Sequence, residues 1–117
     1  MKRIFNAFLN SLRALKYLLS HEKAIIQEFV FFLVSLPFAF CLAKDCASFL
    51  LLAGSIFFVI LIEVINTAIE ATCNAITREY NKDVKIAKDA GSLAVLLSII
   101  IAIVIWSWMI IKTLFFA

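Results

Sequence analysis

The chain has 117 residues, of which 65% are hydrophobic, and its mean hydropathy is +1.07. This composition excludes a soluble globular domain, because so short a chain cannot bury that much apolar surface. The net charge of +3 is modest and we expect no nucleic-acid partner. The long uncharged runs instead predict an all-α integral membrane protein with a single domain, 1–117.

The N-terminal segment, 2–20, predicts an amphipathic helix on the membrane surface. Its apolar residues recur at three- and four-residue steps, and basic or amide side chains occupy the remaining face. The apolar set is Phe5, Phe8, Leu9, Leu12, Leu15 and Leu19. This pattern is typical of a helix that lies in the interface with its basic face toward the lipid headgroups.

Three apolar runs predict three membrane-spanning helices. We expect the first span at 26–43, a tight turn at Lys44 and Asp45, and the second span at 46–76, whose last residues extend into the cytoplasm. The polar stretch 77–89 is predicted to be a cytoplasmic loop, and the third span follows at 90–116. The uncharged part of the second span rises roughly 25 Å, which places Glu63 near a membrane face.

The basic residues predict the orientation of these helices. Of the 11 Lys and Arg residues, only Lys44 and Lys112 lie on the side opposite to the surface helix. The others are Lys2, Arg3, Arg13, Lys16, Lys23, Arg78, Lys82, Lys85 and Lys88. Because cytoplasmic segments carry an excess of basic residues, we expect the N-terminus and the polar loop in the cytoplasm.

The stretch "EVINTAIEA", 63–71, carries two carboxylates and an amide at the end of the second apolar run. A helix turns about 100° per residue, so Glu63, Asn66 and Glu70 fall within an arc of roughly 60°. One interpretation is a polar seam that specifies helix association. Two carboxylates on one face repel each other, however, and need a cation, a proton or a basic partner.

The predicted start of the third span lies at the same membrane depth as these glutamates and carries Lys88, Asp89 and Ser92. Asp89 could simply favour a helix N-terminus, and Lys88 could be an anchor that reaches the interface. Together with the glutamates they indicate a site, because carboxylates and a lysine at a membrane surface suit Mg²⁺ and phosphate. The chain has only two glycines, so a glycine-rich phosphate loop is excluded.

These motifs resemble a known family. "EVINTAIEA" followed by "AKDAGSLAVL", with "HEKAIIQE" before the first span, is similar to the small integral-membrane diacylglycerol kinases of bacteria, whose Gram-positive relatives phosphorylate undecaprenol. The similarity covers nearly the whole chain. It implies a homotrimeric bundle in the bacterial cytoplasmic (inner) membrane, with active sites between subunits. It also implies ATP as phosphoryl donor, Mg²⁺ as metal and diacylglycerol as acceptor.

The resemblance also implies a role for individual residues. Glu63 would be the general base that acts on the lipid hydroxyl, and Glu22 and Glu70 would hold the metal. The ATP-binding set would be Arg3, Asn10, Glu22, Asn66, Glu70, Glu79, Tyr80, Asn81, Lys88 and Asp89. The lipid-binding set would be Ser11, Glu28, Glu63, Ser92 and Trp106. The chain departs from the family at two positions: Asn10 stands where an aromatic residue is common, and Asn74 where aspartate is usual.

Two other functions compete with this prediction. The first is an undecaprenol kinase, with the same chemistry on another lipid; the "HEKAIIQE" run is more similar to the diacylglycerol branch. The second is a small ion-translocating membrane subunit with Glu63 as proton carrier. Such a subunit would not require Lys88 and Asp89 beside the carboxylates, or Glu22 on a preceding helix. Lipid-dependent turnover of ATP would exclude it, and a purely structural membrane protein is a third, weaker interpretation.

Overall fold

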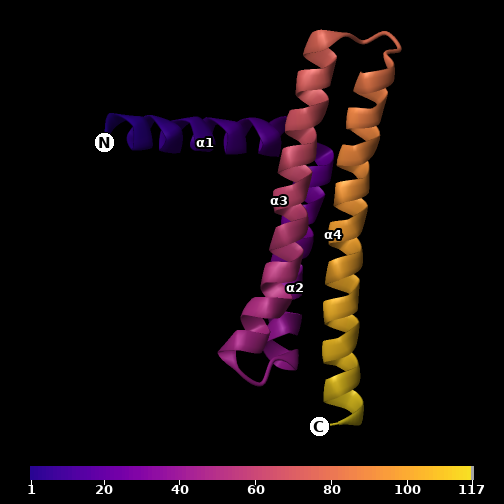
Figure 1. The fold of residues 1–117 in the computed structure, drawn as a ribbon. Coiled ribbons are helices and arrows are strands. Elements are labelled where there is room, and N and C mark those ends of the chain that lie inside the picture. The colour runs from indigo at the N-terminus through magenta and orange to yellow at the C-terminus, as the bar shows by residue number, and fades with distance from the viewer. Residues whose placement is uncertain (117) are drawn as a thin grey trace.

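The computed structural model describes residues 1–116, and its regular structure there is helical throughout. The helices are α1 (Lys2–His21), α2 (Lys23–Leu42), α3 (Cys46–Ile76) and α4 (Lys82–Phe115) (Figure 1). Helices α2, α3 and α4 are each long and apolar enough to cross a membrane. The prediction of an all-α membrane protein with an N-terminal helix and three spans is therefore confirmed.

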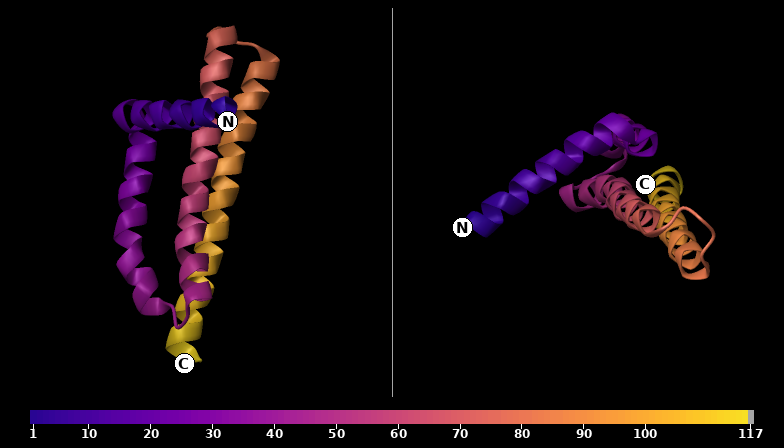
Figure 2. Two further views of the ribbon diagram at one scale, coloured as in Figure 1. Left: turned by 90° about the vertical axis from the view of Figure 1, so that its left-hand side faces the viewer. Right: turned by 90° about the horizontal axis from the view of Figure 1, so that it is seen from above.

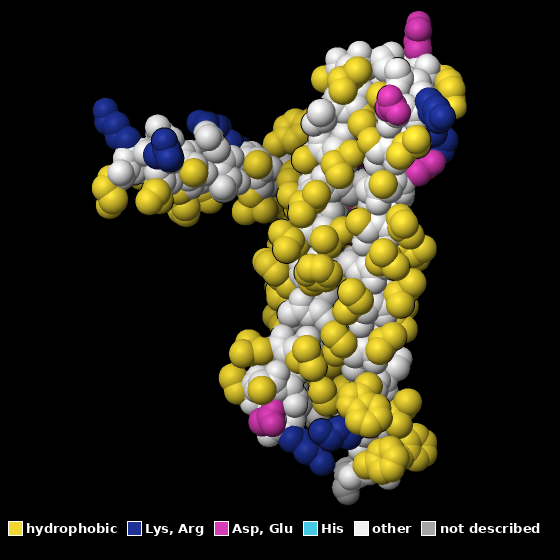
Figure 3. Space-filling model, viewed as in Figure 1, with side chains coloured by type: hydrophobic (Ala, Val, Ile, Leu, Met, Phe, Trp, Pro, Cys, Tyr) yellow, Lys and Arg dark blue, Asp and Glu magenta, His cyan; other side chains and the backbone are white. Residues whose placement is uncertain are grey.

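Helix α1 stands apart from the bundle that the other three helices form. It projects sideways from them, as both views in Figure 2 show, and among residues 1–116 it packs only against α2. The chain bends sharply at Glu22, whose backbone is extended between the two helices. Figure 3 shows hydrophobic side chains along one face of α1 and Lys and Arg on the opposite face. This separation of faces is the predicted amphipathic pattern.

The turn between α2 and α3 carries a helix cap. The Asp45 carboxylate accepts a hydrogen bond of 2.7 Å from the backbone N–H of Ser48, in the first turn of α3. This bond lowers the pKa of Asp45 below its ordinary value, because it favours the charged carboxylate. Asp45 thus satisfies one of the backbone donors that a helix N-terminus leaves free, and it fixes where α3 begins.

The polar stretch between α3 and α4 differs from the predicted loop at 77–89. The connection covers only 77–81, and α4 is already helical at Lys82. The side chain of Asn81 accepts hydrogen bonds from the backbone N–H groups of Asp83 and Val84, at 3.0 and 3.2 Å. An ion pair of 2.8 Å between Lys85 and Asp89 then joins adjacent turns. Hydropathy alone marks 82–89 as a loop, but the Asn81 cap and the Lys85–Asp89 ion pair stabilise it as a helix.

A buried apolar cluster lies where α2, α3 and α4 meet. Ala39, Leu52 and Met109 form a buried cluster, and Trp106 packs against it. The indole N–H of Trp106 donates to the Leu52 carbonyl and to Ser55 Oγ, each at 3.1 Å. Most other large apolar side chains are exposed along the three spans (Figure 3), as expected for surfaces that contact lipid rather than water.

Candidate active site

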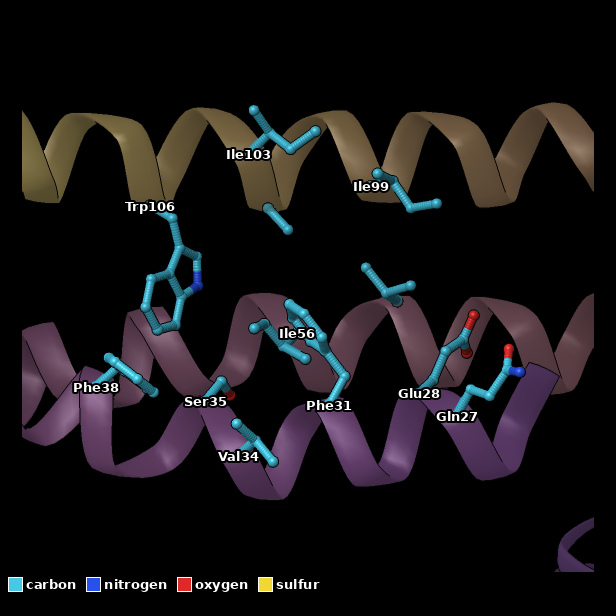
Figure 4. Close-up of a pocket in the computed structure, with 12 residues that line it drawn as sticks. Gln27, Glu28, Phe31, Val34, Ser35, Phe38, Ile56, Ile99, Ile103 and Trp106 are labelled. Atoms are coloured by element: carbon cyan, nitrogen blue, oxygen red, sulfur yellow. The ribbon is translucent and has the colours of Figure 1, made fainter. Parts of the chain in front are cut away.

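Two hollows lie beside α3, and they differ in chemistry. The first is an apolar groove of about 630 Å³ between α2, α3 and α4 (Figure 4). The second is a polar pocket of about 400 Å³, which joins the α1–α2 bend to the last turns of α3. The apolar groove can take hydrocarbon chains, whereas the polar pocket can take a charged ligand.

Glu28 gives the apolar groove one polar end. In Figure 4 its carboxylate and the amide of Gln27 lie at one end of the groove, and Trp106 lies toward the other. Isoleucine, valine and phenylalanine side chains line the space between them. Glu28 Oε1 is buried and has no hydrogen-bond partner among residues 1–116. A buried acceptor without a donor costs free energy, so this end of the groove suits a ligand that brings a hydroxyl or N–H group.

The polar pocket brings together Glu22 and Glu70, which the family resemblance implies as metal ligands. The other residues that line it are Tyr17, Thr67, Ala71, Asn74, Ala75 and Arg78. Glu22 reaches the pocket because the chain bends there, and Glu70 because it lies on the α3 face that points the same way. Arg78 forms no ion pair within residues 1–116. Two carboxylates and a guanidinium around one cavity can hold a metal ion together with an anion.

The predicted polar face of α3 joins the two hollows. Asn66 is 6% exposed, and its Nδ2 donates to Glu70 Oε1 at 3.1 Å. Glu63 is half-buried one turn earlier on the same helix. It lines neither hollow itself, but on the same side of α3 Val59 lines the groove one turn before it and Thr67 lines the pocket one turn after it. Glu63 is therefore the residue that stands between the apolar and the charged ligand volumes.

Lys88 and Asp89 have different partners. The Lys88 ammonium donates to Asn74 Oδ1 at 2.9 Å, across from α4 to α3, and Asn74 lines the polar pocket. Asp89 instead pairs with Lys85 on the exposed side of α4. Lys88 thus bonds to a residue that lines the pocket, whereas within residues 1–116 Asp89 forms no hydrogen bond or ion pair with the glutamates of α3.

Several predicted site residues lie away from both hollows within the chain. Arg3, Asn10 and Ser11 are exposed on α1, which packs only against α2. Asn10 accepts a hydrogen bond from Arg13 on the same helix. Glu79, Tyr80 and Asn81 are exposed in the α3–α4 connection, and Ser92 is exposed on α4. A single chain therefore brings together the acidic centre of the predicted site but not its outer parts.

The pocket fits a metal that arrives with its ligand better than a resident one. Within residues 1–116, no group of three or more His, Cys, Asp or Glu side chains is arranged to hold a metal ion. Magnesium, however, is commonly bound by one or two carboxylates together with phosphate oxygens. Glu22 and Glu70 supply two carboxylates at one cavity, and this donor set fits that mode of binding.

Sequence reasoning gave no role to two of the residues that line the polar pocket, Arg78 and Tyr17. Arg78 was used only as one of the basic residues that set the orientation. Tyr17 stacks on His21, with ring centroids 4.1 Å apart, next to the bend at Glu22. The spacing of residues in the sequence marks neither of them. Tyr17 reaches the pocket because the chain bends after α1, and Arg78 because it follows the end of α3.

Comparisons with known proteins identify the family of the chain. The model of the family described as prokaryotic diacylglycerol kinase matches residues 9–110. A diacylglycerol kinase of Escherichia coli strain K12 is 38% identical over 104 residues, which cover 89% of this chain and 85% of that protein. Diacylglycerol kinases of Helicobacter pylori strain 26695 and Pseudomonas aeruginosa are 33% and 31% identical over 90% and 92% of this chain, and over 82% and 87% of their own lengths. The chain belongs to the prokaryotic diacylglycerol kinase family and is a lipid kinase that spans the membrane several times.

Proposed function

We propose that the chain transfers the γ-phosphate of ATP to the free hydroxyl of diacylglycerol and so produces phosphatidic acid. One observation carries the proposal: the apolar groove ends at Glu28, whose Oε1 has no hydrogen-bond partner among residues 1–116, and Glu63 lies one helical turn beyond Val59, an α3 residue that lines the same groove. A lipid whose acyl chains fill the groove would bring its hydroxyl to this end. The name that the curated relatives carry supports diacylglycerol as that lipid.

In this mechanism, the hydroxyl oxygen of the lipid attacks the γ-phosphorus of ATP while Glu63 takes the hydroxyl proton. The bond between the γ-phosphorus and the β–γ bridging oxygen breaks, and ADP leaves with its electrons. Glu28 accepts a hydrogen bond from the hydroxyl and so orients it. Lys88 and Arg78 contribute positive charge at the rim of the polar pocket, where the phosphates of ATP would lie. Mg²⁺ held by Glu22 and Glu70 would neutralise charge on the phosphate oxygens.

The same proposal gives the site an orientation. Both the polar pocket and the α1–α2 bend lie toward the end of the bundle that carries most of the basic residues, which favours the cytoplasmic side of the bacterial inner membrane. ATP is then available at the pocket, and the acceptor enters the groove from the bilayer without leaving its hydrocarbon environment.

We further propose that the working enzyme is a homotrimer whose sites are shared between chains. Within residues 1–116, Tyr17 near the end of α1 is the one residue of that helix that lines the polar pocket, and Arg3 and Asn10 lie further toward its other end. They can bind ATP if α1 lies over a neighbouring copy. The test mixes an Arg3→Ala chain with a Glu70→Gln chain during reconstitution. Activity above that of either variant alone supports shared sites, and activity no higher than that of the variants contradicts them.

The acceptor is tested with γ-labelled ATP and two lipids in parallel. The purified chain is reconstituted with diacylglycerol or with undecaprenol, and label in each lipid is measured over time. Label in diacylglycerol alone, or at a much higher rate, supports the proposal. Preferential labelling of undecaprenol would assign the chain to that activity instead, and label in neither lipid would refute the proposed reaction.

A further inference from the structure

Gly91 of α4 lies directly against the amide of Asn66 on α3. A Cβ atom added at Gly91 would lie 2.2 Å from Asn66 Oδ1 and 3.3 Å from Asn66 Cγ. The first separation is far shorter than any contact that real Cβ atoms make. Both residues are buried, so a methyl group at Gly91 would fit only if the Asn66 amide rotated away from its present position. The amide of Asn66 therefore occupies the volume that any other side chain at position 91 would need.

The chemistry around Asn66 fixes which way its amide points. Its Nδ2 donates to Glu70 Oε1 at 3.1 Å, whereas its Oδ1 has no hydrogen-bond partner among residues 1–116. The opposite orientation would place Oδ1 against a carboxylate oxygen, and two acceptors repel. The oxygen must then face α4, where Gly91 offers only its backbone. A glycine Cα–H is a weak donor for such an oxygen, and a methyl group would displace it.

We propose that Gly91 is a positioning residue of the kinase site: the absence of a side chain seats the Asn66 amide, and that amide holds the Glu70 carboxylate in place at the polar pocket. Glu70 is itself exposed, and a free glutamate side chain samples many rotamers. The hydrogen bond from the buried amide selects one of them. The inference rests on the proposed function, in which Glu70 is a ligand of the metal that accompanies ATP.

The test compares two glycine variants. Gly91→Ala adds a methyl group against the amide, and Gly54→Ala is the matched control, because a Cβ added at Gly54 meets nothing within 4 Å. Binding of Mn²⁺ to the full, detergent-solubilised chain is measured by electron paramagnetic resonance with a non-hydrolysable ATP analogue present. We expect Gly91→Ala to weaken Mn²⁺ binding about ten-fold, the size of a lost hydrogen bond to a charged group, and Gly54→Ala to leave it unchanged.

A double variant separates positioning from simple helix packing. If Gly91 acts through Asn66, then Asn66→Ala and Asn66→Ala/Gly91→Ala bind Mn²⁺ equally weakly, and the double variant regains the thermal stability that Gly91→Ala alone loses. Parental Mn²⁺ binding by Gly91→Ala, or additive losses in the double variant, would overturn the inference. If Gly91→Ala alone does not fold, folding of the double variant supports the contact and its failure to fold refutes it.

Lipid phosphorylation by the parent chain is measured separately. A parent that labels no lipid contradicts the proposed function, whatever the glycine variants do. A parent that labels diacylglycerol, with unaltered Mn²⁺ binding in Gly91→Ala, contradicts only the role of Gly91.

Discussion

Replacing Glu63 with glutamine removes a carboxylate but no contact that holds the described fold together. The backbone carbonyl of Glu63 accepts a hydrogen bond of 3.0 Å from Thr67 Oγ1, and this bond does not depend on the side chain. Within residues 1–116, the Glu63 carboxylate itself takes part in no hydrogen bond or ion pair. A neutral amide also costs less to place in a membrane than a carboxylate does. The variant should therefore fold and assemble at least as well as the parent.

The expected effect on catalysis is large. Glutamine has the size of glutamate but cannot take the proton of a hydroxyl. Loss of a general base typically slows a reaction about 10²–10⁴-fold, which corresponds to about 3–5 kcal/mol of barrier. Binding of ATP should change little, because Glu22, Glu70 and Arg78 at the polar pocket are all retained.

The assay measures three quantities on the same preparation: the initial rate of diacylglycerol phosphorylation, the affinity for ATP, and the resistance of the assembly to detergent. The control is Asp83→Asn, which removes the same charge from an exposed position in the first turn of α4. A Glu63→Gln variant that keeps most of its activity would show that Glu63 is not the base. A variant that is inactive only because it no longer assembles would show that the polar face of α3 is structural.

Four further substitutions test other parts of the site. Glu22→Gln and Glu70→Gln should each raise the Mg²⁺ concentration for half-maximal activity, because each removes one of two carboxylates at the pocket, and an unchanged Mg²⁺ titration in both would contradict the metal assignment. Lys88→Ala should raise the KM for ATP more than that for lipid in steady-state kinetics, since its ammonium reaches the pocket through Asn74; the reverse pattern would place Lys88 at the acceptor. Trp106→Phe should lower the stability of the fold by about 1–2 kcal/mol in reversible unfolding, because it loses the indole hydrogen bond, and equal stability would show that this bond contributes nothing.

The number and order of the membrane-spanning helices could be predicted, because the length of each uncharged apolar run determines whether it can cross the membrane. Runs of uncharged residues mark α2, α3 and the main part of α4. The turn at Lys44 and Asp45 is so short that α2 and α3 must be adjacent and antiparallel. The start of α4 was missed for a physical reason. Its first eight residues are too polar for a span, and their helical state depends on the Asn81 cap and on the Lys85–Asp89 pair. Hydropathy does not register these local interactions.

The candidate site could be predicted only where one helix carries it. Helical spacing places Glu63, Asn66 and Glu70 on one face, and the structure has Asn66 bonded to Glu70. Contacts between helices depend on how α3 and α4 are packed along their length, and the sequence does not specify this register. The pairing of Lys88 with Asn74 could therefore not be foreseen, and neither could the separation of Asp89 from the glutamates.

Two buried oxygen atoms lack hydrogen-bond partners among residues 1–116, Glu28 Oε1 and Asn66 Oδ1, and they differ in what can compensate for them. Each costs about 1–3 kcal/mol, so a fold optimised for stability alone would have no reason to keep either. The Glu28 carboxylate lines the open apolar groove, and rotation about its last bond exchanges its two oxygens, so a donor that enters the groove can satisfy it. The Asn66 oxygen faces Gly91 and has no such access. The free energy that this unpaired oxygen costs is offset by the Nδ2 of the same amide, which donates to Glu70 and holds it at the polar pocket. If the proposed function holds, the acceptor end of the site is completed by its substrate, whereas the phosphate end is held in place by the protein.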